Sequence, residues 1–234
     1  MNQAFGGQTL VYLENGRRRT FAGAIDWPGW CRMGDDEESA LQALFTIMPR
    51  YAAVMQAAQI EFQAPLDLSS FIVVERLVGN GTTDFGAPNI SPSNDNRILN
   101  ETEFMRLQAL IMACWQAFDA AVISASGREL RKGPRGGGRD LLGIMAHLIN
   151  SDAGDLPRLA ASYRLPDPTN PVNELGGLRQ AMLNAFTRAA LDKMPSAGPR
   201  GGVVWTARQY ARNLAWHTLD HAWEIEDRLM ETED

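Results

Sequence analysis

Hydrophobic and polar positions along the first hundred residues predict a small unit of mixed α and β structure. Two strand-like runs, 8–14 and 18–26, flank Asn15-Gly16, a strong hairpin signal because both residues readily take positive φ. A helix is expected next, where acidic residues precede a series of apolar side chains at helical spacing: Leu41, Leu44, Phe45 and Met48. Pro49 is expected to kink or end this helix. The β-rich run 69–79 predicts a further strand.

The remainder of the chain carries a helical pattern throughout. Turn-forming residues dominate 80–97, so we place a domain boundary near residue 100. The first helix after it should begin with Asn100 or Thr102 as its cap and present one apolar face from Phe104 to Val122. Three more helices are expected, at 141–163 with a break near 154–157, at about 174–193, and from about Thr206 to the last residues. The predicted fold class is α+β, with domains at 1–100 and 101–234, the second a four-helix bundle.

Composition restricts the possible partners and compartments. The chain has 234 residues, 45 % of them hydrophobic, a formal net charge of -6 and a pI near 5.2, which argues against nucleic acid as a partner. Its two cysteines, Cys31 and Cys114, fit a reducing compartment better than a disulfide framework. We see neither a secretory signal nor a membrane-length apolar run, and therefore expect a cytoplasmic protein without membrane contact.

The three histidines are the strongest chemical signal. His217 and His221 lie one turn apart on one side of the last predicted helix, and His147 lies among apolar residues of another. Three imidazoles from two packed helices can bind one face of a divalent cation and leave other positions open. The alternative is that His147 is a hydrogen-bonded core residue and the pair a solvated edge. The residues alone leave these two interpretations about equally weighted.

The helical half resembles the DinB/YfiT-like superfamily. The resemblance rests on "MAHLINSDAGDL" and "AWHTLDHAWEIEDR" and covers about residues 101–234. Members carry one histidine on the second helix, which His147 matches, and an HxxxH pair on the fourth, which His217 and His221 match. The resemblance implies a divalent metal ion held by these three residues.

The chemistry around that ion is less determined by sequence. Zinc is our first expectation, while nickel, iron and copper also suit imidazole ligands. Glu224, one turn beyond His221 on the same stripe, is the candidate catalytic residue that would move protons. Asp152 and Asp220 are further candidates to fix the imidazole tautomers, although each could simply belong to a solvated helix face.

Four arginines are candidates for binding a cofactor or substrate. Arg135 and Arg139 lie in the glycine-rich stretch 132–142 just before a helix start, where an anion could bind, although a flexible linker between helices is the favoured interpretation. Arg208 and Arg212 alternate with Trp205 and Tyr210, a pattern that suits a nucleotide or thiol-cofactor pocket or the packed end of a bundle.

The N-terminal part resembles the HicB family of antitoxins. The similarity spans about residues 8–58 and rests on "IDWPGWCRMGDDEESALQAL", with one residue more than the family pattern between Gly29 and Cys31. It implies a small α+β unit that acts in binding. No helix-turn-helix segment or basic arm is evident, so we expect a lid, a dimerisation surface or a substrate-shaping role, and a homodimer.

Two functions follow as hypotheses. The DinB-like resemblance implies a metal-dependent enzyme, for example a thiol-dependent S-transferase or isomerase that uses a low-molecular-weight thiol on a small electrophilic substrate; iron-based oxygen chemistry is a variant. The alternative is a non-catalytic binding or regulatory protein with a structural or vestigial metal site.

Overall fold

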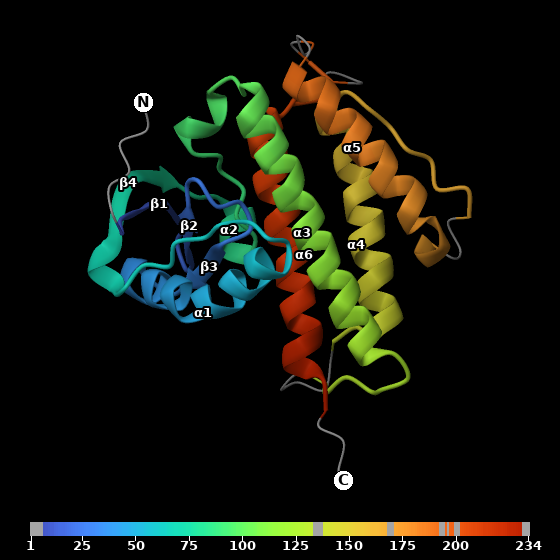
Figure 1. The fold of residues 1–234 in the computed structure, drawn as a ribbon, viewed down its shortest axis with the longest axis horizontal. Helices are drawn as coiled ribbons and strands as arrows, with labels where there is room; N and C mark the ends of the chain where they lie inside the picture. Colours follow the sequence, from blue (N-terminus) through green and yellow to red (C-terminus); the bar gives the residue numbers. More distant parts are fainter. Residues whose placement is uncertain are drawn as a thin grey trace. The chain divides into compact units, whose positions relative to one another are not determined.

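The chain folds into a mixed α+β structure with two compact units, Met1–Arg97 and Ile98–Asp234. The computed structural model describes residues 7–132, 138–167, 171–191, 195, 197–198 and 202–230. Figure 1 shows the strands together with a long helix in the first unit, and further long helices in the second.

A four-stranded sheet with the order β3-β2-β1-β4 forms the first unit. Its strands are β1 (Thr9–Asn15), β2 (Thr20–Ala24), β3 (Cys31–Gly34) and β4 (Phe71–Val78). β2 is antiparallel to β1 and β3, whereas β4 runs parallel to β1. The strand β3 was not predicted, because it has only four residues and they do not alternate between apolar and polar. The predicted hairpin is present, but its loop is Gly16–Arg19, closed by a 2.8 Å bond from Gly16 N to Arg19 O, and Gly16 does not take positive φ.

The helix α1 (Glu37–Ala57) covers this sheet and contradicts one expectation. It starts at a capping box between Asp36 and Ser39 and continues beyond Pro49 for two more turns. The helix does not end at the proline because residues on both sides of it, including Leu44 and Tyr51, are fully buried. This packing outweighs the hydrogen bond that a proline removes.

Polar contacts hold the irregular part of the first unit. This part contains η1 (Leu68–Ser70), α2 (Gly81–Phe85) and η2 (Ser93–Asn96), the last two within the stretch expected to be only turns. The buried Glu14 on β1 accepts hydrogen bonds from the Thr83 hydroxyl at 2.5 Å and from the backbone N–H groups of Asn89 and Ile90 at 3.0 Å. One carboxylate therefore anchors residues 83–90 to the sheet.

The second unit is helical. Its elements are α3 (Glu101–Ala125), α4 (Leu141–Asp155), η3 (Leu156–Leu159), η4 (Pro171–Glu174), α5 (Leu175–Leu191) and α6 (Ala207–Arg228). Asn100 caps α3 as expected, and the predicted break after residue 154 is the change from α4 to η3. The last helix ends at Arg228, earlier than expected, because Leu229 leaves the helix to bridge to Leu130. Residues 192–193 and 231–234, predicted as helical, lie outside the described residues.

The bundle core places α4 against α6. α3 packs along α6 over much of its length, and Figure 1 shows these two helices side by side. The core cluster joins α3, α4 and α6 through the side chains of Phe118, Ile144, Leu148, Ala222 and Ile225. α4 and α6 run antiparallel, because Arg139 at the start of α4 contacts Arg228 at the end of α6, whereas Asp152 lies beside His217.

The two cysteines, Cys31 and Cys114, are free thiols, and both are buried.

In the described part of the chain, α3 is long and apolar enough to cross a membrane by length and composition. Yet 44 % of the most apolar 18-residue stretch of this helix is buried inside the protein. Its buried face supplies much of the bundle core, as expected for a core helix.

Candidate metal centre

The three histidines converge on one point. His147 projects from α4 and His217 and His221 from α6, and one nitrogen of each lies within 4.8 Å of the others. The Nε2 atoms of His147 and His217 are 3.4 Å apart. The ring centroids are separated by 4.8–5.4 Å and the rings are steeply inclined to one another. The arrangement could hold a metal ion, in agreement with the prediction.

The spacing fits nitrogen ligands of a single ion. Two nitrogens bound at about 2.0–2.1 Å in a tetrahedral arrangement lie about 3.3–3.4 Å apart. The 3.4 Å between His147 and His217 matches that separation and is long for a direct N–H···N hydrogen bond. His221 is buried, and the other two rings are partly exposed.

Both rings of the α6 pair have an acidic neighbour at Nδ1. His221 Nδ1 lies 2.8 Å from Glu224 Oε2, so the Nδ1–H group donates a hydrogen bond to the carboxylate. The lone pair on Nε2 is then free to bind a metal. The hydrogen bond from His221 is the main cause that lowers the pKa of Glu224, and Arg228 contributes further. His217 Nδ1 lies 3.7 Å from Asp152 Oδ1, beyond hydrogen-bond length.

Burial is the main cause that keeps His147 and His217 neutral, and the pKa of each is lowered to about 4. For His147, Arg139 and the neighbouring imidazoles contribute to this lowering. Near neutral pH both rings therefore carry a free lone pair, which is the form that binds metal.

A buried acidic group adjoins His217 and was only partly predicted. Asp152 is 6 % exposed, and burial raises its pKa to about 8. Burial, followed by the charge of Asp152, raises the pKa of Asp155 to about 6. The Tyr210 hydroxyl is buried without a hydrogen-bond partner, and burial raises its pKa well above 10. Asp155 was missed, and Tyr210 was named only beside the arginines of the last helix, although both lie on the stripes of α4 and α6 that carry the histidines.

The predicted arginines separate into different environments. Arg139 is close enough for its charge to lower the pKa values of His147 and His217, so it lies near the cluster. Arg208 pairs with Glu103 at 2.8 Å, and Arg212 is buried in α6. Arg135 lies outside the described residues. The charge of Asp220 acts on His217 and raises its pKa, against the larger lowering effect of burial.

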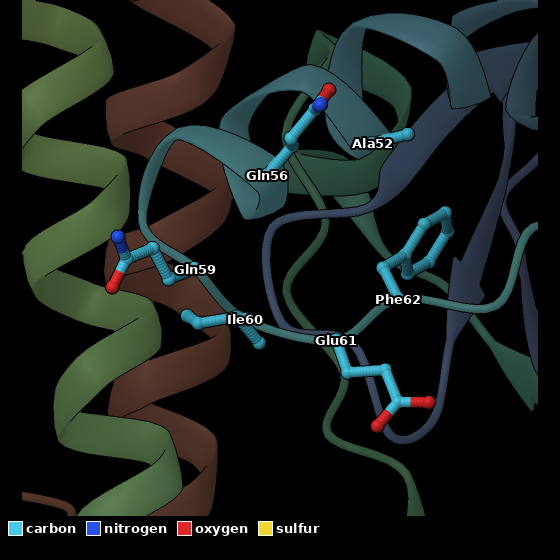
Figure 2. A pocket seen from close by; sticks show the side chains of 6 residues that line it. All are labelled: Ala52, Gln56, Gln59, Ile60, Glu61 and Phe62. Atoms are coloured by element: carbon cyan, nitrogen blue, oxygen red, sulfur yellow. The ribbon is translucent and has the colours of Figure 1, made fainter.

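A hollow in the first unit has no comparable chemistry. It has a volume of about 430 Å³ and lies at the end of α1, as Figure 2 shows. Its lining is Ala52, Gln56, Gln59, Ile60, Glu61 and Phe62, in which Glu61 is the only ionisable side chain. The histidine cluster therefore remains the strongest candidate site among the described residues.

Comparison with known proteins gave no relative: no protein family, no curated protein and no solved structure matches the chain.

Proposed function

We propose that this protein is a divalent-metal-dependent enzyme of the DinB-like kind, acting on a small electrophilic molecule as a thiol-dependent S-transferase or isomerase. The observation that carries the proposal is the convergence of His147, His217 and His221 with a 3.4 Å separation between two of their nitrogens. Imidazole ligands suit zinc first, then nickel or iron. The resemblance in the bundle supports the reaction class, and the HicB-like resemblance supports a binding or dimerising role for the N-terminal unit.

A bound divalent ion would lower the pKa of a coordinated water or thiol and so supply a nucleophile near neutral pH. The protein contributes the surroundings. Three nitrogens on one side leave the remaining coordination positions open. Glu224 accepts a hydrogen bond from the Nδ1–H group of His221, and this contact fixes the orientation of that ring.

Charges near the cluster favour a particular kind of substrate. Arg139 places a positive charge close to His147, which would attract an anionic electrophile or the carboxylate of a thiol such as glutathione. Asp155, with a pKa raised to about 6, lies near His217 and can exchange a proton close to neutral pH. We therefore assign the proton transfer to Asp155, while Glu224 stays ionised and orients His221.

The test measures metal content first and activity second. Untagged wild-type protein should contain close to one equivalent of metal, and the His217→Ala/His221→Ala double variant should contain none while keeping the same circular dichroism spectrum. Asn213→Ala on the same helix is the control and should retain the metal. A folded wild-type protein that binds no added zinc, nickel or iron contradicts the proposal.

Activity separates the enzyme from the alternative. Metal-loaded protein is mixed with glutathione or cysteine and 1-chloro-2,4-dinitrobenzene, and thioether formation is followed by absorbance. We expect a rate above the uncatalysed background that disappears on chelation and in the double variant. Stoichiometric metal without any turnover over a panel of thiols and electrophiles would instead support a non-catalytic binding protein.

A further inference from the structure

Arg228, the last residue of α6, binds three acceptors on three different segments. Its Nη1 donates to Glu224 Oε1 at 2.6 Å. Its Nε donates to the Arg131 carbonyl at 2.9 Å, and its Nη2 to the Arg139 carbonyl at 2.7 Å. The planar guanidinium has donors on all three nitrogens, so a single side chain can satisfy these acceptors at once.

The surrounding chain is shaped to receive this side chain. Gly138 has a φ of +118°, and a Cβ there would lie 2.9 Å from Arg228 Nη2. Glycine suits the positive φ, and any larger residue there would also have to displace the end of the Arg228 side chain. The Arg131 N–H donates in return to the Arg228 carbonyl at 2.7 Å, and Leu130 bridges to Leu229. The end of α6 is thus docked against two stretches of the connection between α3 and α4, residues 130–131 and 138–139.

The contact with Glu224 connects this docking point to the histidine cluster. Glu224 uses its two oxygens for different partners: Oε2 faces His221 Nδ1 and Oε1 faces Arg228. Arg228 therefore fixes the rotation of the carboxylate that orients His221. An ordinary exposed pair four residues apart on a helix adds little stability. Arg228 differs from such a pair because its side chain is 16 % exposed and also holds two backbone carbonyls.

We propose that Arg228 is a positioning residue of the metal centre. It holds Glu224 against His221, while its other donors are fixed by the backbone carbonyls of Arg131 and Arg139. This inference rests on the proposed function, since it requires that the three histidines bind a metal. It adds a residue that touches neither metal nor substrate and acts only through Glu224.

The experiment compares cobalt and zinc binding in purified full-length variants. Cobalt(II) is titrated into metal-free protein, and its visible spectrum reports the ligand geometry; zinc affinity follows by competition. Arg228→Met should lose about 10–100-fold in affinity, the usual effect of removing a group that supports a metal ligand, and its cobalt spectrum should change. Arg228→Lys keeps a cation near Glu224 and should recover part of the affinity. The matched control is Arg131→Met, because that side chain donates to the Asp227 carbonyl at the same helix end without reaching Glu224.

A double-mutant comparison distinguishes positioning from general stability. Glu224→Gln alone and Glu224→Gln combined with Arg228→Met should bind zinc equally weakly, because Arg228 acts through Glu224. Additive losses in the double variant, or an unchanged affinity and spectrum in Arg228→Met, would overturn the inference. If Arg228→Met does not fold, Arg228→Lys and Arg228→Gln are compared in the same way. Wild-type protein that binds neither cobalt nor zinc defeats the proposed function itself, which is a separate outcome.

Discussion

Replacing Asp152 with asparagine should stabilise the metal-free protein, and more so at high pH. The side chain is 6 % exposed, and burial raises its pKa to about 8 from an ordinary value of 3.8. The folded protein therefore keeps a proton on Asp152 that the unfolded chain releases. Asparagine has the same shape and never ionises.

The direction of the pH dependence follows from linkage. Because the pKa is higher in the folded state, the folded state binds more protons between the two pKa values, and the free energy of unfolding falls as pH rises from about 4 to 8. A separation of about four pKa units corresponds to about 4 kcal/mol at pH 7. This is an upper bound, because side chains and water relax around a buried charge. We expect the advantage of Asp152→Asn to grow by about 1–3 kcal/mol between pH 5 and pH 8.

Urea unfolding of chelator-treated protein at pH 5 and pH 8 measures this change. Wild type, Asp152→Asn and Asp227→Asn are compared, the last because its carboxyl group is exposed on α6. The stability difference between wild type and Asp152→Asn should widen with pH, whereas that of Asp227→Asn should not. A difference that is the same at both pH values would show that Asp152 ionises in the folded protein as freely as in the unfolded chain, and the argument from burial would be wrong.

Two further predictions concern the bundle itself. Asn100→Ala removes the 2.9 Å hydrogen bond from the Glu103 N–H to the Asn100 side chain, which caps α3. Its free energy of unfolding in urea should fall by about 1 kcal/mol, whereas that of Asn100→Ser should change little. An unchanged stability in the alanine variant would refute the capping role. Phe118→Ala empties a fully buried position between α3, α4 and α6, and its free energy of unfolding in urea should fall by about 3–5 kcal/mol. Met112→Ala, on the exposed side of α3, is the control and should lose less. Equal losses in the two variants would refute the assignment of the core.

The elements that were predictable are those set by local spacing. The helices of the second unit follow from apolar residues at helical intervals and from cap residues such as Asn100. The proximity of His217 and His221 follows from their separation by one helical turn. The position of His147 beside them depends on how α4 packs against α6; the residues alone left it open, and the family resemblance favoured it. The structure confirms that the three lie close enough to hold a metal.

The features that were missed depend on contacts between distant segments. The helix α1 continues through Pro49 because Leu44 and Tyr51 are buried against the rest of the first unit. Asp155 is unremarkable in the sequence, and its raised pKa arises only when packing buries it. The role of Arg228 depends on carbonyl groups 89 and 97 residues away in the chain. No periodic pattern encodes such a meeting of segments.

The parallel pairing of β1 with β4 sets an order on folding. The β1–β2 hairpin joins strands that are adjacent in the sequence and can form within microseconds. The pairing of β1 with β4 instead requires Thr9 and Phe71, which are far apart in the sequence, to come together. Closing so long a stretch of chain is entropically unfavourable until α1 has already shortened the distance between the two strands. The slow step in assembling the first unit should therefore be the addition of β4, and until then β1 presents an unpaired edge to other chains.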